Sequence, residues 1–329
     1  MDILGQTLTA ASSNLLQPAV LFFALGMTAA FARSDLALSR DTAKTLSLIL
    51  MLCIGFKGGV EARTHGLDAD FLKAAALGVA LSALMPLPAY LLLRRSGLNA
   101  VTAAATAAHY GSVSVVTFAA AQACLSEAGL TPGGYMSAVL ALMETPALLT
   151  SLAIATLADR KANGGAPVAK LLQEVLLNAA SVVLIGSFLI GLLTGPSGGA
   201  RLAIFSGPVF QGVLCLFLLD LGVKAGRQLT SARTLTVPVV AMGLLLPLLG
   251  AATALVLGHL LGLAPGDLAM LAVLAGSASY IAAPAAMGLA LPKADAGVYL
   301  TLALGVTFPF NLTIGIPLYA LVAGQLTGL

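Results

Sequence analysis

Two short runs of glycine and serine hold most of the groups in this chain that suit ligand binding. The first is Gly111-Ser112-Val113-Ser114 and the second is Gly276-Ser277-Ala278-Ser279-Tyr280. Both lie inside long apolar segments, where glycines and paired hydroxyls predict an interrupted helix. An interruption exposes the first amides of the following half-helix, which carry roughly half a positive charge. Two such ends meeting at mid-membrane would bind a small monovalent anion, with the serine hydroxyls as further donors. The alternative is that these small residues only let helices pack closely.

Glu144 is the only acidic residue near the centre of an apolar segment. An ionised carboxylate at that depth costs about 2.5–3.5 kcal/mol, which marks Glu144 as a functional candidate. It is a candidate cation ligand or proton carrier, aided by backbone carbonyls that Pro146 leaves free. The alternative is a structural carboxyl satisfied by a neighbouring hydroxyl such as Thr145.

Further polar residues lie at matching depths in other apolar segments. Thr307 precedes Pro309 as Glu144 precedes Pro146, and Asn311 and Thr313 follow. These neutral groups are candidate cation partners or ordinary packing hydrogen bonders.

The residues beside the two runs add three roles. His109 is a candidate proton carrier or anion donor, with packing as the alternative. Tyr280 is placed to gate the site or to bond its contents. For a sodium ion, the candidate ligands are Ser112, Glu144 and Ser279.

The elements that must position these residues are membrane spans. The chain has 329 residues, 59% of them hydrophobic and 9% charged, with a mean hydropathy of +1.01. Soluble domains carry about 25% charged residues, so an all-α polytopic membrane protein is predicted. Ten spans are expected, over Asn14–Phe31, Ala43–Val60, Phe71–Leu93, Ala100–Cys124, Gly134–Leu157, Lys170–Thr194, Pro208–Lys224, Thr234–Leu261, Asp267–Leu291 and Ala296–Gly324.

Basic residues orient the spans, because cytoplasmic loops carry an excess of lysine and arginine. Four basic residues fall on one side, namely Lys57, Arg63, Lys73 and Arg201. The other twelve fall on the opposite side, namely Arg33, Arg40, Lys44, Arg94, Arg95, Arg160, Lys161, Lys170, Lys224, Arg227, Arg233 and Lys293. The side with twelve is predicted to be cytoplasmic, which places both termini outside the cytoplasm.

The two halves of the chain repeat. Gly55-Phe-Lys57-Gly-Gly59 matches Gly222-Val-Lys224-Ala-Gly226, and the glycine–serine runs and the Pro146 and Pro309 segments match in the same order. Because each repeat has five spans, the second enters the membrane from the opposite face. The expected division is residues 1–160, a join over 161–169 and residues 170–329, with spans four and nine interrupted.

Other functions find little support in the sequence. The basic residues are scattered rather than clustered, which argues against nucleic-acid binding. Cys53, Cys124 and Cys215 lie in separate apolar segments and are expected to be small buried hydrophobes. Zinc-protease, P-loop and dinucleotide motifs are missing, so an ion gradient is the expected energy source. Two alternatives from other functional classes remain. The protein could be a channel, or an intramembrane enzyme that uses Ser112 or Ser114 beside His109.

Several segments resemble the sodium-dependent bicarbonate transporters first known from cyanobacteria. The similar segments are Gly55–Arg63, Gly111–Val115, Met143–Leu148, Leu219–Lys224, Gly276–Tyr280 and Gly315–Leu318. The resemblance implies a ten-span inverted-repeat fold in which spans four and nine cross. It also implies a gate bundle of spans 1, 2, 6 and 7, a core bundle of spans 3–5 and 8–10, and a homotrimer. Bicarbonate and sodium would bind at the crossing, and a PII-like protein is a possible regulator.

The chain departs from the cyanobacterial pattern at two places. Tyr280 stands where that pattern has an acidic residue, which leaves the substrate and the coupling ion open. The join Ala158–Lys170 is much shorter than the cyanobacterial insert, which leaves the PII-like regulator open as well. The leading hypothesis is sodium-coupled uptake of bicarbonate through a cell (inner) membrane. The alternative is proton- or sodium-coupled transport of another small anion or organic acid.

Overall fold

The computed structural model describes residues 16–66, 68–158, 179–231 and 235–328. All regular structure in these ranges is helical, with no strand, and seven helices are long and apolar enough to cross a membrane. The prediction of an all-α, multi-pass membrane protein is therefore confirmed. The join 161–169, the first residues of the chain and the basic residues Arg160, Lys161, Lys170 and Arg233 lie outside the described ranges.

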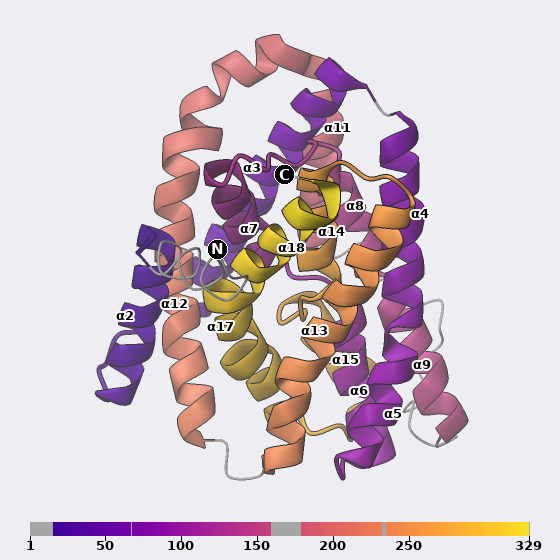
Figure 1. Ribbon diagram of the computed structural model, residues 1–329. Coiled ribbons are helices and arrows are strands. Elements are labelled where there is room, and N and C mark those ends of the chain that lie inside the picture. The colour runs from indigo at the N-terminus through magenta and orange to yellow at the C-terminus, as the bar shows by residue number, and fades with distance from the viewer. Residues whose placement is uncertain (1–15, 67, 159–178, 232–234, 329) are drawn as a thin grey trace.

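Figure 1 shows the helices in chain order. In the first half they are α2 (Pro18–Phe31), α3 (Arg40–His65), α4 (Ala69–Leu84), α5 (Pro86–Arg95), α6 (Ala100–Gly111), α7 (Val115–Glu127), α8 (Met136–Glu144) and α9 (Pro146–Ala158). In the second half they are α11 (Ala179–Arg201), η1 (Phe205–Val209), α12 (Phe210–Ser231), α13 (Val237–Leu260), α14 (Pro265–Ala275), α15 (Ala282–Ala290), α16 (Ala296–Leu300), η2 (Thr301–Thr307), α17 (Phe308–Phe310), η3 (Asn311–Gly315) and α18 (Ile316–Thr327).

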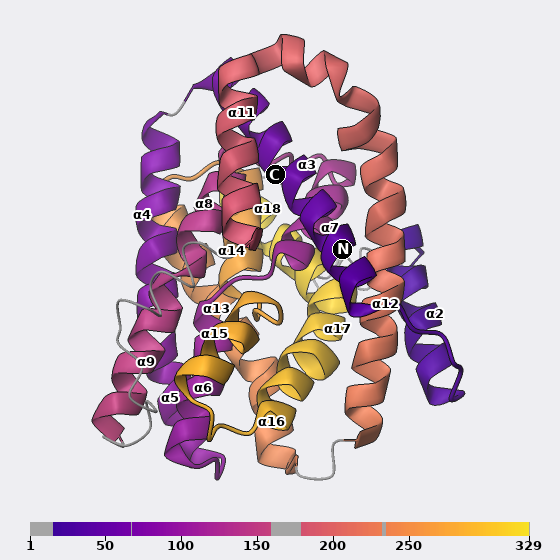
Figure 2. The same cartoon turned by 180° about the vertical axis from the view of Figure 1, so that it is seen from behind.

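Two pairs of helices pack along each other, α2 with α12 and α3 with α11. Figure 1 and Figure 2 show α2 against α12 at one edge, and α4, α5 and α9 at the other. Helix α3 packs along α11 in the same way as α2 packs along α12. The shorter helices α6, α7 and α14 to α18 lie between these edges, where most of the buried residues are found.

Glycine permits the close approach within each long pair. A Cβ atom at Gly222 would overlap the carbonyl of Phe23, and one at Gly191 would overlap the carbonyl of Phe56. Lipid is as apolar as the helix surfaces, so association depends on such close packing rather than on the hydrophobic effect. The glycine motifs of the sequence therefore fix which helices pair.

Prolines divide several predicted spans. The expected third span consists of two helices that meet at Pro86. The expected fifth span also consists of two helices, the first ending at Glu144 and the second beginning at Pro146. Helix α13 instead continues through Pro247. The glycine-rich segment Gly195–Gly199 holds a kink at Gly195, where φ is 58°, and helical structure continues to Arg201.

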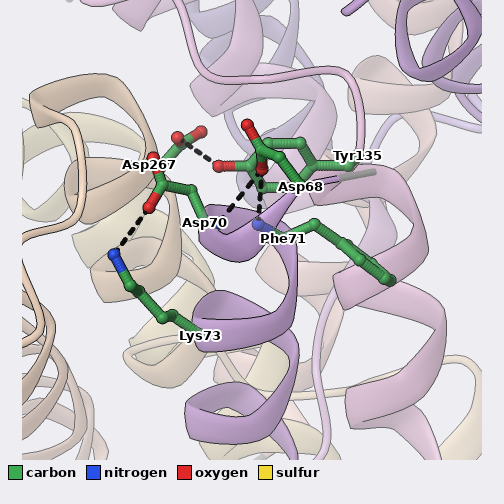
Figure 3. A network of polar contacts seen from close by, with 6 residues as sticks. All are labelled: Asp68, Asp70, Phe71, Lys73, Tyr135 and Asp267. Carbon is green, nitrogen blue, oxygen red and sulfur yellow. Dashed lines mark hydrogen bonds and ion pairs between the residues drawn. The ribbon is translucent and has the colours of Figure 1, made fainter. Parts of the chain in front are cut away.

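A polar network joins three helix ends on the face predicted to lie outside the cytoplasm (Figure 3). The Asp267 carboxylate, in the first turn of α14, accepts hydrogen bonds from Tyr135 Oη at 2.5 Å and Gly133 N at 2.7 Å. Asp68 caps α4, and the Phe71 ring lies edge-on to Tyr135 at 5.8 Å. The network fixes the outer end of α14 against the loop before α8.

Replacing Gly191 by alanine is predicted to destabilise the protein, because the new methyl must push α11 away from α3. Overpacking of this kind costs about 1–3 kcal/mol, equivalent to a midpoint lower by on the order of 5 °C. Unfolding in detergent is measured with a thiol-reactive dye, since the chain has 3 cysteines and no tryptophan.

The matched control is Gly186→Ala on the same helix, where a Cβ meets no atom within 4 Å. That change is expected to leave the midpoint unchanged or to raise it, because alanine favours a helix by about 1 kcal/mol over glycine. Equal midpoints for the two variants would contradict glycine-dependent packing of α3 on α11.

Candidate functional site

Both predicted helix interruptions are present. Helix α6 ends at Gly111 and α7 begins at Val115, which leaves 112–114 as the first break. Helix α14 ends at Ala275 and α15 begins at Ala282, which leaves 276–281 as the second break. The residues Gly111, Ser112, Val113, Ser114, Gly276, Ser277, Ala278, Ser279 and Tyr280 are all buried.

The two breaks are in direct contact, although they lie far apart in sequence. The backbone N–H of Ser114 donates to Ser277 Oγ at 3.0 Å. The backbone N–H of Ser279 donates to the carbonyl of His109 at 2.8 Å. Each break thus satisfies backbone groups of the other, as buried irregular backbone requires.

The first break is also bonded to the end of α8. Ser112 Oγ donates to the carbonyl of Glu144 at 3.2 Å, and Ser82 Oγ of α4 donates to the carbonyl of Met143 at 2.5 Å. Pro146 prevents α8 from continuing normally, and these two carbonyls at the helix end therefore accept from serines. Both carbonyls accept from serine hydroxyls, so neither is left free as the sequence led us to expect.

The second break is bonded to η3 through Asn311. Its Nδ2 donates to the carbonyl of Gly276 at 2.7 Å, and its Oδ1 accepts from Tyr319 Oη at 3.2 Å. Asn311 is 1% exposed, so both bonds are screened from water. The same helical segment carries Thr313, whose hydroxyl bonds the Pro309 carbonyl one turn earlier. Thr313 is therefore not joined to the breaks.

Thr307 connects the first interrupted helix to α13. Its hydroxyl donates to the carbonyl of Gly243 at 2.7 Å and lies 2.8 Å from Tyr110 Oη. Because the Gly243 carbonyl can only accept, the single Thr307 proton goes to it and Tyr110 must donate to Thr307. Thr307 thus positions Tyr110, the residue directly before Gly111.

Two of the four serine hydroxyls donate within the protein, and the other two accept from backbone N–H groups. The protons of Ser112 and Ser277 go to the carbonyls of Glu144 and Leu274. Ser114 Oγ accepts from Thr117 N at 3.1 Å, and Ser279 Oγ accepts from Ala283 N at 3.3 Å. These hydroxyls mainly cap helix ends and join them to each other. Serine is favoured at the start of a helix because its hydroxyl accepts from a backbone N–H of the first turn.

Backbone amides remain at the start of both half-helices. Val115 and Val116 are the first two residues of α7, whose N–H groups by position have no acceptor within the helix. In α15, Pro284 occupies the first turn and has no N–H, so that end offers fewer donors. The positive end of α7 is therefore the better anion donor of the two.

Proline and glycine pack the breaks from outside. A Cβ atom at Gly111 would lie 2.6 Å from Pro86 Cγ, and one at Gly276 would lie 2.9 Å from the carbonyl of Pro247. Gly250 allows α13 to approach the Ala275 carbonyl at the end of α14. The contacts of Pro86 and Pro247 with the two breaks are equivalent in position, and neither proline was predicted to be part of the site.

His109 faces away from the other break. Its Nδ1 lies 2.7 Å from the Ala105 carbonyl, and its ring stacks on Tyr299 with centroids 4.4 Å apart. The carbonyl can only accept, so Nδ1 carries a proton and the fully buried Nε2 has no partner within the described chain. His109 therefore touches the site through its backbone, and its side chain keeps one unused nitrogen.

Tyr280 forms one end of a row of three aromatic rings. Its ring meets Phe308 edge-on at 5.3 Å, and Phe308 meets Phe23 of α2 edge-on at 5.2 Å. The Tyr280 hydroxyl is near Ser114, yet it makes no hydrogen bond of normal geometry with the described residues. This row separates the second break from α2 and places an unpaired hydroxyl beside the first break.

Charge at the site is sparse. Glu144 is 4% exposed, at the point where α8 ends. The sequence has no lysine or arginine over 96–159, 234–292 or 294–329, which include both interrupted helices. The segments that form the breaks therefore carry no basic side chain of their own, and their helix ends supply only partial positive charges. No group of three His, Cys, Asp or Glu side chains is placed to hold a metal ion in the ranges described.

The remaining sequence predictions fall outside the breaks. Asp220 and Lys224, four residues apart on α12, pair at 2.6 Å, with the carboxylate buried. Cys53 is buried and Cys124 and Cys215 are half-buried, all as free thiols. Sequence reasoning missed Ser82, Tyr110 and Tyr319, which hold the breaks or their partners. Hydroxyls inside an apolar segment were the available signal for Ser82.

Comparison with known proteins supports a transport function. The profile of the Na+-dependent bicarbonate transporter superfamily matches residues 18–324. The chain belongs to this family. The protein is therefore a membrane transporter and not an enzyme. No match was found among curated proteins.

Removing the Asn311 side chain is predicted to loosen the second break. Asn311→Leu leaves the buried Gly276 carbonyl without its donor, a loss of about 1–3 kcal/mol. Amides of residues 276–281 should then exchange with deuterium about tenfold faster. The measurement is hydrogen–deuterium exchange by mass spectrometry on the purified protein in detergent.

Thr313→Val is the matched control, because that hydroxyl bonds only within its own helix. It should leave exchange over 276–281 unchanged. If both variants show wild-type exchange there, Asn311 does not hold the second break.

Proposed function

We propose that this transporter takes up bicarbonate together with sodium, at a site between the two helix breaks. The observation that carries the proposal is the direct contact of two interrupted helices in a chain of this family. Interrupted helices at mid-membrane are typical of substrate sites in secondary transporters. The amides that begin α7 and α15 would hold the anion, as helix N-termini do elsewhere.

Sodium compensates for the lack of basic side chains around the breaks. One sodium ion beside the anion would supply a full positive charge where the helix ends supply only partial ones. Glu144 is its proposed carboxylate ligand, with carbonyl and hydroxyl oxygens near Ser112 and Ser279 as neutral ligands. Such an oxygen set suits a hard cation. Because Tyr280 stands in place of an acid, the proposed carboxylate ligand comes from the end of α8 instead of from the second break.

The proposed architecture has ten spans in two inverted repeats. The pairing of α2 with α12 and of α3 with α11 supports it, because a two-fold relation between repeats exchanges these pairs. We assign these four helices to a gate bundle and the rest to a core bundle that moves against it. The proposed assembly is a homotrimer in a cell inner membrane with both termini outside the cytoplasm; regulation by a PII-like protein remains a proposal.

Labelled bicarbonate uptake into proteoliposomes tests the function. An inward sodium gradient should raise the initial rate severalfold over an equal potassium gradient, and sodium uptake should rise when bicarbonate is added. Empty liposomes provide the background. Uptake that is indifferent to sodium would refute the coupling, and absence of any bicarbonate uptake would refute the substrate.

Glu144→Gln separates sodium coupling from proton coupling. If Glu144 binds sodium, the half-saturating sodium concentration should rise about tenfold, because losing a buried charged partner costs at least about 1.4 kcal/mol. Asp35→Asn, in the exposed loop after α2, is the control and should behave as wild type. Uptake driven by a pH gradient and unaffected by sodium would instead favour proton coupling.

Proton coupling has one observation in its favour, the unpartnered Nε2 of buried His109. In that case His109→Gln would abolish uptake driven by the pH gradient. Under sodium coupling the same variant keeps its sodium dependence.

A further inference from the structure

A cavity of about 310 Å³, with several polar side chains in a largely apolar wall, lies between α3, α7 and the η1–α12 segment. Its walls include Lys57 of α3, Gln122 and Glu127 of α7, and Gln211 of α12. Liquid water occupies about 30 Å³ per molecule, so the space suits a small anion with several waters. The cavity lies between helices of the proposed gate bundle and α7 of the proposed core bundle.

One end of the cavity lies close to the first break. Ala119 lines it, and Ala119 is four residues after Val115, where α7 begins. Four residues of α-helix span about 6 Å. The lining residues of α7 run from there to Glu127 at the far end of the helix, so the cavity follows the half-helix outward from the break.

Lys57 is the only basic residue among the lining residues. It is exposed, and the ion pairs of the described chain, Lys73–Asp70 and Lys224–Asp220, do not include it. Glu127, the acidic residue of the lining, accepts a hydrogen bond from Gln17 Nε2 at 2.8 Å. The amide groups of Gln122 and Gln211 add neutral donors that can replace water around an anion.

The equivalent lysine of the second half is neutralised. Lys224 matches Lys57 in the repeated glycine motif, and it pairs at 2.6 Å with Asp220. At the place of Asp220, four residues before the lysine, the first half has the neutral Cys53. Within the described chain, Lys57 is thus in no ion pair, whereas its counterpart Lys224 is paired on its own helix.

We propose that this cavity is the outer entry chamber for the transported anion and that Lys57 attracts the anion into it. The proposal rests on the function proposed above. A lysine at the wall of a cavity raises the local concentration of anions close to it. On the other face Lys224 is held by Asp220 at 2.6 Å, so that lysine is not free to attract an anion. In this proposal Lys57 attracts the anion into the cavity, and other residues bind it at the breaks.

Substitutions of Lys57 test the capture step in proteoliposomes. Lys57→Gln should raise the KM for bicarbonate about fivefold with Vmax within about twofold, and Lys57→Arg should restore the KM. Raising the ionic strength should increase the wild-type KM and leave that of Lys57→Gln unchanged, because salt screens the charge. The control Lys73→Gln, which removes a paired lysine on the same predicted face, should keep the wild-type KM.

A second measurement does not depend on transport. In a variant with Cys53, Cys124 and Cys215 replaced by alanine, Gln122→Cys places a thiol in the cavity. A membrane-impermeant anionic methanethiosulfonate added from outside should react with it faster than the cationic reagent. Adding Lys57→Gln should reduce the ratio of the two rates about fivefold.

The outcomes distinguish the two proposals. An unchanged rate ratio after Lys57→Gln, or a thiol inaccessible from outside, overturns the entry chamber even if bicarbonate is transported. A wild-type KM in Lys57→Gln also overturns it. If bicarbonate is not transported but the rate ratio falls as expected, the proposed substrate fails and the anion-attracting chamber stands.

Discussion

The structure depends on one constraint, that backbone polar groups at a helix break inside a membrane must be bonded within the protein. The two breaks satisfy this by bonding each other, through Ser114 N to Ser277 Oγ and Ser279 N to the His109 carbonyl. Each break therefore needs the other to satisfy its backbone hydrogen bonds, although Ser114 and Ser277 are 163 positions apart in the sequence. The surrounding helices are arranged to bring these segments together, and Asn311 adds the bond that the Gly276 carbonyl requires.

Packing around the breaks uses residues with small or rigid side chains. Gly250 lets α13 reach the end of α14, and Pro86 and Pro247 lie against the two breaks. On the other side of the molecule, glycines hold α3 to α11 and α2 to α12 at the shortest separations that helices permit. Tight pairs of this kind make stiff units, which suits a mechanism in which one bundle moves as a body against the other.

Much of this could be predicted from the sequence, because the signals are local. Gly111 and Gly276 within apolar segments predicted the breaks, whereas the end of α8 before Pro146 was not predicted and divides the expected span Gly134–Leu157. The hydrogen bonds between residues far apart in the sequence could not be predicted. Those of Tyr110 with Thr307 and of Ser82 with Met143 depend on how the spans cross. The serines were assigned as free ligand donors because their local sequence does not show which carbonyl lies opposite each hydroxyl. The role of Pro86 was missed for the same reason.

Phe308, the middle ring of the aromatic row, connects α2 to the second break. Its ring has Phe23 of α2 on one side and Tyr280 of the second break on the other. A displacement of α2 removes one neighbour of Phe308 and changes the packing that holds Tyr280. If a ligand at the breaks displaces Tyr280, it also changes which position of α2 is favoured, and this linkage is reciprocal. Phe308 is the side chain through which the second break and α2 share a contact.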